Sequence, residues 1–160
     1  MNGPTMTLGE LNPDFRDFLV LLADEGADFV VVGAYALAFH GAPRASGDID
    51  LFIRPSEENA PKVYRALVAF GAPVEAAGLK QSDLATPGIV YQVGLPPRRI
   101  DVLTQISGAT FDEVWARRQQ TIVAGRVIAV IGREDFLRNK RASGRPKDLA
   151  DAARLAKLLP

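Results

Sequence analysis

Apolar residues recur along the chain at the three- and four-residue spacing that is typical of helices. Phe15, Phe18, Leu19 and Leu22 follow this spacing and predict an amphipathic helix over residues 14–25. Other helix-favouring segments end at glycine or begin beside proline, as helices often do. They predict five more helices, at residues 34–40, 56–70, 110–118, 134–142 and 146–159.

Runs of β-branched and aromatic residues predict strands between these helices. The run FVVV at residues 29–32 is apolar throughout, which is typical of a strand buried on both faces. Further strands are predicted at residues 48–53, at 89–95 and 98–104 joined through Pro96-Pro97, and in a hairpin at 121–131 that turns at Ala124-Gly125. This order indicates an α/β or α+β fold, with a small mixed sheet and helices packed on it.

Composition limits the size and the chemistry of the protein. With 160 residues, 48% of them hydrophobic, the chain is expected to form a single domain over residues 1–160, with a C-terminal helical segment from about residue 133. The absence of cysteine excludes disulfides, thiolate metal sites and a cysteine nucleophile, and a single histidine, His40, excludes multi-histidine metal sites. The amino terminus lacks a secretory signal, and the longest apolar run, residues 29–39, is too short to span a bilayer. We therefore expect a cytoplasmic protein without a membrane partner.

Positive charge is concentrated near the carboxyl end, although the whole chain is balanced. Lysine plus arginine number 19 and aspartate plus glutamate number 19, so no global field indicates a nucleic-acid partner. Between residues 133 and 147, however, six basic residues meet two acidic ones. This basic run is either a solvated helix face or a local patch for an acidic partner. Its basic members are Arg133, Arg138, Lys140, Arg141, Arg145 and Lys147.

Two aspartates interrupt the apolar strand in the stretch RASGDIDLFI, residues 44–53. Side chains alternate along a strand, so Asp48 and Asp50 share one face while the isoleucines and leucine between and after them face the core. Asp101, in RRIDVLT, occupies a second strand-like run. If the two strands are neighbours, the three acids form one pocket, where a divalent cation such as Mg²⁺ would relieve their repulsion. Solvent-facing polarity and the DxD of a metal-dependent glycosyltransferase stay open as other interpretations of this pattern.

A glycine turn precedes the acidic strand and completes a recognisable combination. The strand VVV runs into Gly33 and then into a helix, an arrangement in which main-chain N–H groups can receive phosphate oxygens. Gly33, the DID at Asp48 to Asp50 and the later ID at Asp101 together resemble the nucleotidyltransferase superfamily of the DNA-polymerase-β type. They are most similar to the small bacterial members that include the AbiEii-type toxins of toxin–antitoxin systems.

The carboxyl-terminal stretch IGREDFLRNKRASGRPKDLADAARL looks like the end of the same small proteins. In that group a lysine, an arginine and a following acid recur, which here are Lys140, Arg145 and Asp148, with Asp151 one helical turn further on. The resemblance covers roughly residues 29–158. Asp148 is expected to orient Lys140 or Arg145, or simply to favour the start of a helix.

The resemblance implies a nucleotidyltransferase fold and specific roles for the acids. Asp48 and Asp50 would hold two Mg²⁺ ions, with Mn²⁺ as a substitute, together with the triphosphate of an NTP. Asp101 would be a further metal ligand and the candidate general base. These three aspartates are the expected catalytic residues.

Nucleotide binding is expected from Gly33, Ala34, Arg44, Ser46 and Lys140. Gly33 would let the backbone approach the phosphates. Members of the superfamily often have serine or glycine after that glycine, so Ala34 leaves only main-chain donors, and Ser46 is a substitute hydroxyl. Arg44 and Lys140 would contact phosphate, or else they are ordinary surface cations.

The implied partners are an NTP, an RNA or protein acceptor, and a cognate antitoxin. The same fold could also act as a catalytically inactive nucleotide- or partner-binding module. Ala34 favours that alternative, whereas the presence of all three acids argues against it. His40 is expected to be a packing or helix-end residue, and Trp115 a core residue.

Overall fold

The computed structural model describes residues 11–44, 47–95 and 98–158. Its helices are α1 (Pro13–Asp24), α2 (Gly33–Phe39), α3 (Ala60–Phe70), the 3₁₀ helix η1 (Gln81–Ala85), α4 (Phe111–Ala116), α5 (Arg133–Ser143) and α6 (Pro146–Ala156). Its strands are β1 (Phe29–Val32), β2 (Ile49–Ile53), β3 (Val90–Val93), β4 (Ile100–Leu103), β5 (Gln119–Val123) and β6 (Arg126–Val130). These elements confirm the predicted mixed fold.

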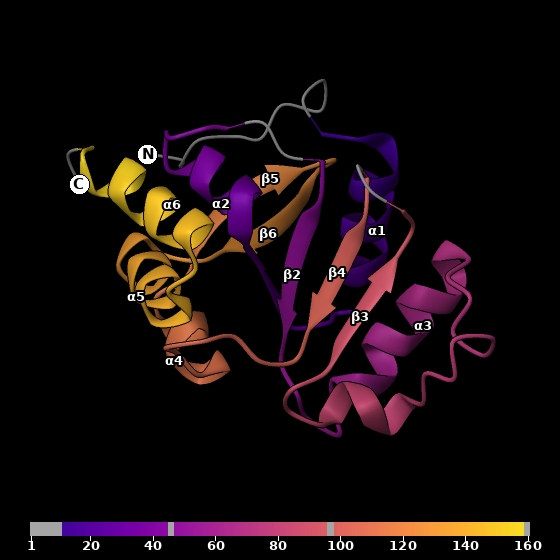
Figure 1. Cartoon of the computed structure of the whole chain (residues 1–160). Coiled ribbons are helices and arrows are strands. Elements are labelled where there is room, and N and C mark those ends of the chain that lie inside the picture. The colour runs from indigo at the N-terminus through magenta and orange to yellow at the C-terminus, as the bar shows by residue number, and fades with distance from the viewer. Residues whose placement is uncertain (1–10, 45–46, 96–97, 159–160) are drawn as a thin grey trace.

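The described strands form one mixed sheet. Its six strands have the order β3-β4-β2-β1-β6-β5. The central pair β1/β2 is antiparallel, its neighbours β2/β4 and β1/β6 are parallel, and the outer pairs β3/β4 and β5/β6 are antiparallel. In Figure 1, α4, α5 and α6 gather on the left of the sheet and α3 lies on its right. The site described below lies between the sheet and the α5–α6 pair.

Local sequence signals explain where several elements begin and end. The side chain of Asn12 accepts a hydrogen bond from the Asp14 N–H at the start of α1. The predicted β5/β6 hairpin is confirmed, because Ala124 and Gly125 have φ angles of 49° and 79°, the two positive values that a tight hairpin turn requires. The predicted turn at Pro96-Pro97 lies outside the described residues. No element was predicted where η1 lies.

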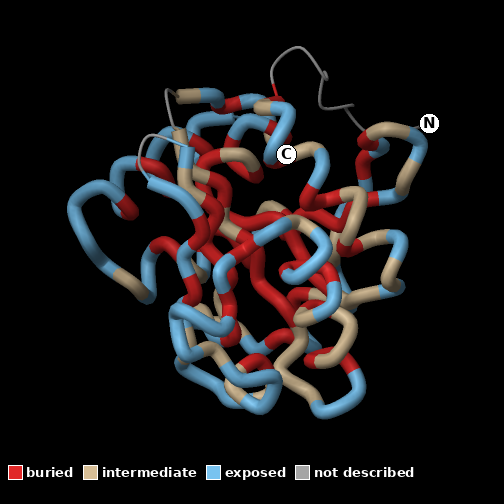
Figure 2. The backbone as a smooth tube through the Cα atoms, turned by 90° about the vertical axis from the view of Figure 1, so that its right-hand side faces the viewer, coloured by how far each residue is buried: buried red, intermediate tan, exposed pale blue. Residues whose placement is uncertain are grey.

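The core fills both sides of the central strands. The four apolar residues that predicted α1 are all at most 1% exposed. On β2, Ile49, Leu51 and Ile53 are buried as predicted, and Phe52 on the acid-bearing face is buried as well because its ring packs against Phe111. Burial of each such side chain contributes about 1.5–3 kcal/mol to stability. Figure 2 shows the buried backbone running through the middle of the molecule.

Within the part of the chain that the structure describes, no helix combines the length and the apolar character that crossing a membrane would need.

Candidate functional site

Asp50 and Asp101 lie directly opposite each other on neighbouring strands. Strands β2 and β4 run parallel, and their register pairs Asp50 with Asp101 and Ile49 with Ile100. The expected adjacency of the two acidic strands is therefore present. The pKa of Asp50 is raised to about 6. Burial is the largest cause, and the nearby charge of Asp101 is the second. The charge of Lys140 acts in the opposite direction but does not offset burial.

Arg99, immediately before β4, contacts Asp48 and Asp101 through its guanidinium group. Its Nε and Nη2 donate to the two carboxylate oxygens of Asp101 at 2.7 and 3.1 Å. Its Nη2 also lies 3.4 Å from Asp48 Oδ2, and its backbone N–H donates to Asp48 Oδ1 at 3.0 Å. We name Asp48, Asp50, Asp101 and Arg99 the strand cluster. Arg99 was not among the residues predicted for the site, although its place two residues before Asp101 puts it on the same strand face.

A metal ion would find suitable oxygen atoms in the strand cluster, but not three carboxylates gathered round one point. Among the described residues, no group of three or more His, Asp or Glu side chains is arranged to hold a metal. The contacts of Arg99 agree with this, because they hold Asp48 and Asp101 to its guanidinium group. The paired Asp50 and Asp101 carboxylates still fit a hard divalent cation by charge and by ligand type.

Gly33 is required by Asp50. The residue has a φ of +71°, and a Cβ atom built on it would lie 2.3 Å from Asp50 Oδ2. No side chain fits there while that carboxylate keeps its position. The structure thus gives Gly33 a role in addition to the predicted approach to phosphate: it leaves space for the acid. Ala34 follows within α2 and is buried.

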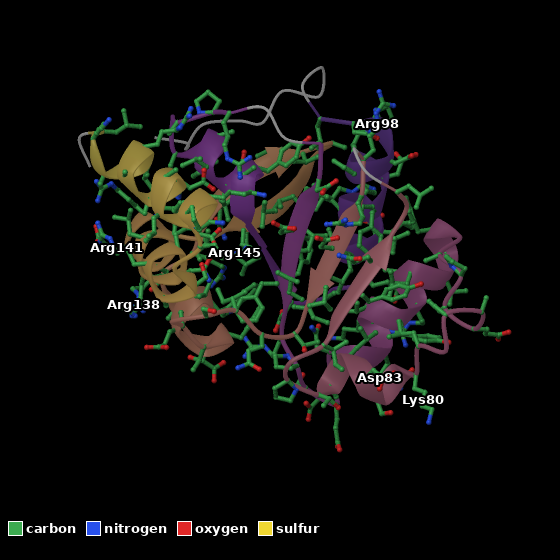
Figure 3. The ribbon with its side chains drawn as sticks, in the orientation of Figure 1. Lys80, Asp83, Arg98, Arg138, Arg141 and Arg145 are labelled. Atoms are coloured by element: carbon green, nitrogen blue, oxygen red, sulfur yellow. The ribbon has the colours of Figure 1, made fainter. Side chains whose placement is uncertain are left out.

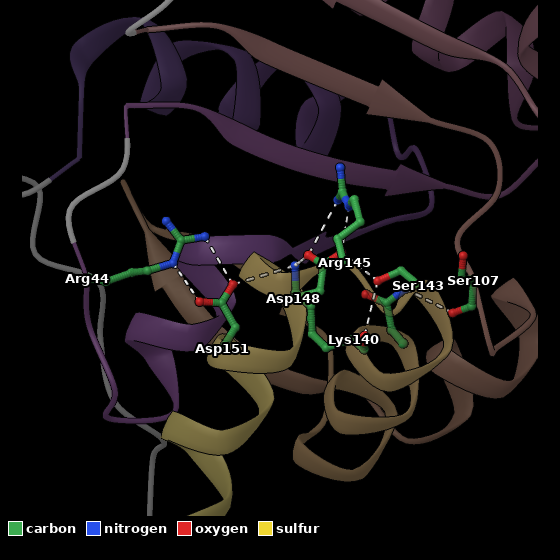
Figure 4. A network of polar contacts seen from close by, with 8 residues as sticks. Arg44, Ser107, Lys140, Ser143, Arg145, Asp148 and Asp151 are labelled. Atoms are coloured by element: carbon green, nitrogen blue, oxygen red, sulfur yellow. Dashed lines mark hydrogen bonds and ion pairs between the residues drawn. The ribbon is translucent and has the colours of Figure 1, made fainter.

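A second group of charged side chains lies on α5 and α6, and Figure 4 shows it from close by. Asp148, fully buried, accepts hydrogen bonds from Lys140 at 3.2 Å, from Ser143 at 2.7 Å and from Arg145 at 2.7 Å. Burial alone would raise its pKa, but these donors outweigh burial and lower the pKa to about 2. Asp148 therefore contacts both Lys140 and Arg145, which agrees with the prediction that it orients one of these two residues.

Arg44 joins this group from the loop before β2. Its Nε and Nη2 donate to the two oxygens of Asp151 at 2.7 and 3.0 Å, and Lys140 Nζ lies 3.8 Å from Asp151 Oδ2. We name the whole set the C-terminal cluster; it consists of Arg44, Lys140, Ser143, Arg145, Asp148 and Asp151. Ser46, predicted to supply a substitute hydroxyl for the one missing at Ala34, lies outside the described residues.

A pocket of about 370 Å³ connects the two clusters. Gly33 and Asp50 line it on the sheet side. Lys140, Arg145 and Asp148 line it from α5 and α6. One cavity is therefore lined by two carboxylates, Asp50 and Asp148, and by two cations, Lys140 and Arg145.

The members of the basic run at residues 133–147 differ in burial. Lys140 is only 8% exposed and belongs to the pocket. Arg138 and Arg141 are exposed and are labelled at the left of Figure 3, on the outer side of the helices. Arg138 lies 3.7 Å from Glu113, so part of its charge is compensated.

His40 lies at a helix end, as expected, whereas Trp115, expected in the core, is only partly buried against it. His40 is the C-cap residue of α2, and its Nε2 is 2.7 Å from the carbonyl oxygen of Ile131. Burial is the main cause that lowers its pKa. Trp115 is partly buried against the core and stacks on Phe111, with Arg118 over its ring at 3.9 Å.

Solved structures of nucleotidyltransferases share this fold. TM1012 from Thermotoga maritima, a protein assigned as a nucleotidyltransferase, superposes with a TM-score of 0.58 at 18% identity, over 96% of this chain and 94% of its own. The antibiotic-resistance factor ANT(2″)-Ia superposes in its solution structure with a TM-score of 0.55 at 12% identity, over 90% and 81% of the two chains. Its crystal structure with adenylyl-2″-tobramycin gives 0.52 at 12% identity, over 88% and 84%. These likenesses define the fold class as that of the nucleotidyltransferases.

Residues 12–160 match the family described as nucleotidyl transferase of unknown function (DUF2204), and the chain belongs to this family. Membership confirms the predicted superfamily, whereas among curated proteins none matches the sequence.

Proposed function

We propose that the protein is a metal-dependent nucleotidyltransferase that moves a nucleoside monophosphate from an NTP to a hydroxyl group. The observation that carries this proposal is the pairing of Asp50 with Asp101, at a pocket that Lys140 and Arg145 also line. Carboxylates suit a divalent cation, and lysine and arginine suit phosphate oxygens. A metal–triphosphate complex presents both kinds of charge, so it complements these carboxylates and cations.

The strand cluster would hold Mg²⁺, or Mn²⁺ in its place, through Asp50 and Asp101 with Asp48 as a further ligand. When bound, the ion supplies positive charge that stabilises the charge developing on the transferred phosphoryl group and on the pyrophosphate. Lys140, held by Asp148, and Arg145 would orient the phosphates from the other wall. The main chain at Gly33 and Ala34 would approach them most closely, because Gly33 carries no side chain.

The reaction makes and breaks one bond to phosphorus. An acceptor hydroxyl oxygen bonds to the α-phosphorus, the bond from that phosphorus to the bridging oxygen breaks, and pyrophosphate leaves with the electron pair. Asp101 is the candidate acceptor of the hydroxyl proton, because it lies on β4 beside Asp50. The oxygens that would take this proton are the ones to which Arg99 donates.

For the acceptor we propose an RNA or a protein, with the chain acting as the toxin of a toxin–antitoxin pair. The C-terminal cluster that carries the resemblance to such toxins is assembled as a connected ion-pair network. Exposed Arg138 and Arg141 beside it offer positive charge to an acidic acceptor. Production of the protein in bacteria should then stop growth, and Asp50→Asn should relieve the arrest. If bacteria that contain the soluble, folded protein grow normally, the toxin role is rejected, but the proposed nucleotidyltransferase activity is not.

Label transfer tests the activity itself. The protein is incubated with α-labelled NTPs, Mg²⁺ and, in separate reactions, total RNA, a cell protein extract or an aminoglycoside, the last because ANT(2″)-Ia was solved with an adenylylated one. We expect label on one acceptor and release of pyrophosphate. Asp50→Asn should lower the rate at least about 10²-fold, the usual effect of losing a group that acts on transition-state charge. Asp17→Asn, an exposed acid on α1 that pairs with Arg16, is the matched control and should retain the rate.

The same protein and ligands also test the alternative, a catalytically inactive nucleotide-binding module. Calorimetry with NTP and Mg²⁺ measures binding without turnover. Metal-dependent binding with no pyrophosphate release in any acceptor reaction would favour a nucleotide-binding module over an enzyme.

A further inference from the structure

The pocket between the sheet and the α5–α6 pair has a charged part and an uncharged part. Its charged lining residues are Asp50, Lys140, Arg145 and Asp148. The lining away from them comes from β3, from the end of β4 with the segment that follows it, and from α5, and it carries no charged side chain. It includes Val90, Leu103, Gln105, Ile106, Ser107 and Asn139. The proposed function assigns phosphates to the charged part, which leaves the uncharged part for another portion of the same substrate.

Strand register places an apolar row beside the acidic one on the same face of the sheet. The first row consists of cross-strand partners on β2, β4 and β3, namely Asp50, Asp101 and Gln92. The next row on that face consists of Phe52, Leu103 and Val90. Alternate residues of a strand share a face and lie about 7 Å apart, so the two rows are that far from each other. The sugar of a nucleotide is long enough to bridge them.

The apolar row is covered at one end and open at the other. Phe52 is 2% exposed, because the ring of Phe111 packs against it. Val90 is 56% exposed and Leu103 is half-buried, and both line the pocket. The open end is therefore a surface of two paired aliphatic side chains. Enzymes use apolar side chains of this kind to hold the flat face of a nucleobase.

Asn139 carries a hydrogen-bond acceptor that no described residue uses. Its Nδ2 donates to the carbonyl oxygen of Ser107 at 2.9 Å, and Figure 4 labels Ser107 at the right of the network. A carbonyl oxygen only accepts, so this contact fixes which end of the amide carries the nitrogen. The other end, Oδ1, accepts no hydrogen bond among those of the described residues, and Asn139 is half-buried. The amide thus presents an acceptor at the uncharged part of the pocket.

We infer that the uncharged part of the pocket binds the nucleobase of the NTP over Val90 and Leu103, and that Asn139 Oδ1 selects a base with an exocyclic amino group. Adenine and cytosine carry this donor, whereas guanine and uracil carry a carbonyl oxygen at the equivalent position. The protein therefore prefers ATP to GTP, and CTP to UTP. This inference rests on the proposed function and names its nucleotide, with Asn139 as the specificity-determining residue. The preference is about fivefold, the effect of one net hydrogen bond, because the second Nδ2 hydrogen can still donate to a carbonyl.

Calorimetry with the full chain, Mg²⁺ and each NTP measures this preference within a matched purine pair and a matched pyrimidine pair. ATP should bind about fivefold more tightly than GTP, and CTP about fivefold more tightly than UTP. Asn139→Leu removes the acceptor and should bring the affinities within each pair to about twofold of each other. Asn139→Asp also loses the hydrogen bond to Ser107 but keeps an acceptor, so it should retain the preference.

Inorganic tripolyphosphate, which has no base, tests the apolar row. Val90→Ser should weaken ATP binding at least about threefold, because apolar contact with the base is lost, and should leave tripolyphosphate binding unchanged. Val127→Ser is the matched control, since Val127 is an equally exposed valine, at 57%, on β6 and outside the lining of this pocket. It should change the binding of neither ligand.

The other outcomes overturn the inference. Equal affinities within both NTP pairs in the wild type would do so without any variant, which covers the case in which Asn139→Leu does not fold. A preference that survives Asn139→Leu would also do so, as would equal losses of ATP and tripolyphosphate binding in Val90→Ser. In all three cases the proposed function stands as long as an NTP binds and label is transferred. If no NTP binds at all, the proposed function is rejected together with the inference.

Discussion

Two groups of aspartates flank the pocket, and their charge balance is opposite. In the strand cluster, three acids share the single cation Arg99. In the C-terminal cluster, two acids meet three cations. The members of that second set are Asp148 and Asp151 with Arg44, Lys140 and Arg145.

The pKa values of two buried acids follow from this difference. The pKa of Asp50 rises to about 6, through burial and then through the charge of Asp101. The pKa of Asp148 falls to about 2 although burial opposes the fall, because Arg145, Ser143 and Lys140 all donate to it. Burial acts in the same direction on both acids, so the supply of donors decides the direction in which each pKa moves. The two clusters therefore differ in how many donors reach each buried carboxylate.

Exchange of each acid for its amide should have the largest effect and should differ between the clusters. Asp148→Asn leaves buried cations with too little negative charge, and we expect it to lower the free energy of unfolding by about 3 kcal/mol. Asp50→Asn removes a repelled charge, and we expect a change below about 1 kcal/mol. Urea denaturation in metal-free buffer measures both. Equal losses in the two variants would mean that the clusters do not differ in charge balance.

Gly33→Ala and Gly26→Ala form a matched pair, because both glycines have a φ of +71°. A Cβ at position 26 meets nothing within 4 Å, whereas one at position 33 meets Asp50. We expect about 1 kcal/mol of destabilisation from the backbone in Gly26→Ala, and a further 1–2 kcal/mol, roughly, from the clash in Gly33→Ala. Nucleotidyl transfer should be lost in Gly33→Ala only. Thermal unfolding measures the stability of the two variants, and the label assay measures their activity. If the two variants behave alike, contact with Asp50 is not the reason that position 33 requires glycine.

Acid should weaken the protein through Asp148. Its pKa is about 2 in the folded protein and 3.8 as the ordinary value, so between these values the unfolded chain binds more protons than the folded one. Asp148 therefore contributes about 2 kcal/mol to the free energy of unfolding. This contribution is fully present above about pH 4 and is lost as the pH falls towards 2. Unfolding experiments across pH 2 to 5 should show this slope in the wild type and a shallower one in Asp148→Asn. An unchanged slope in that variant would assign the effect to other acids.

The ion pair of Arg44 with Asp151 should have the smallest effect of the four. It is two-pronged, and its acid is only 3% exposed. We expect Arg44→Gln to cost about 1–2 kcal/mol, since charged hydrogen bonds in such sites contribute that much. Arg16→Gln breaks an exposed pair with Asp17 and should cost less than about 0.5 kcal/mol. If the two variants lose equal stability, Arg44 is not part of the C-terminal cluster in solution.

The sequence predicts the strand acids well because their arrangement follows from local rules. Alternation alone puts Asp48 and Asp50 on one face, and the short apolar run round Asp101 indicates a second strand. The paired strands β2 and β4 then bring Asp50 opposite Asp101. Likewise, the helical spacing that predicts α1 and the glycines that end α3 and α5 are local signals.

The contacts that sequence reasoning could not supply depend on register and on distant segments. Arg44 meets Asp151 across 107 positions of the chain, and no local pattern predicts that pair. Arg99 reaches Asp48 only because β4 aligns with β2 in one register. The helix η1 has too few residues to show a period, and its start depends on Asp83 accepting the Lys80 N–H.

The order of strands has a consequence for protein synthesis. Strand β1 lies in the middle of the sheet, and its parallel neighbour β6, paired through Val31 and Val130, emerges from the ribosome much later, followed by α5 and α6. Contacts between such distant segments form slowly, because a long loop must close first. A nascent chain would therefore carry its acidic strands well before the wall with Lys140 exists. We expect catalytic competence to appear only after the final helix has left the exit tunnel.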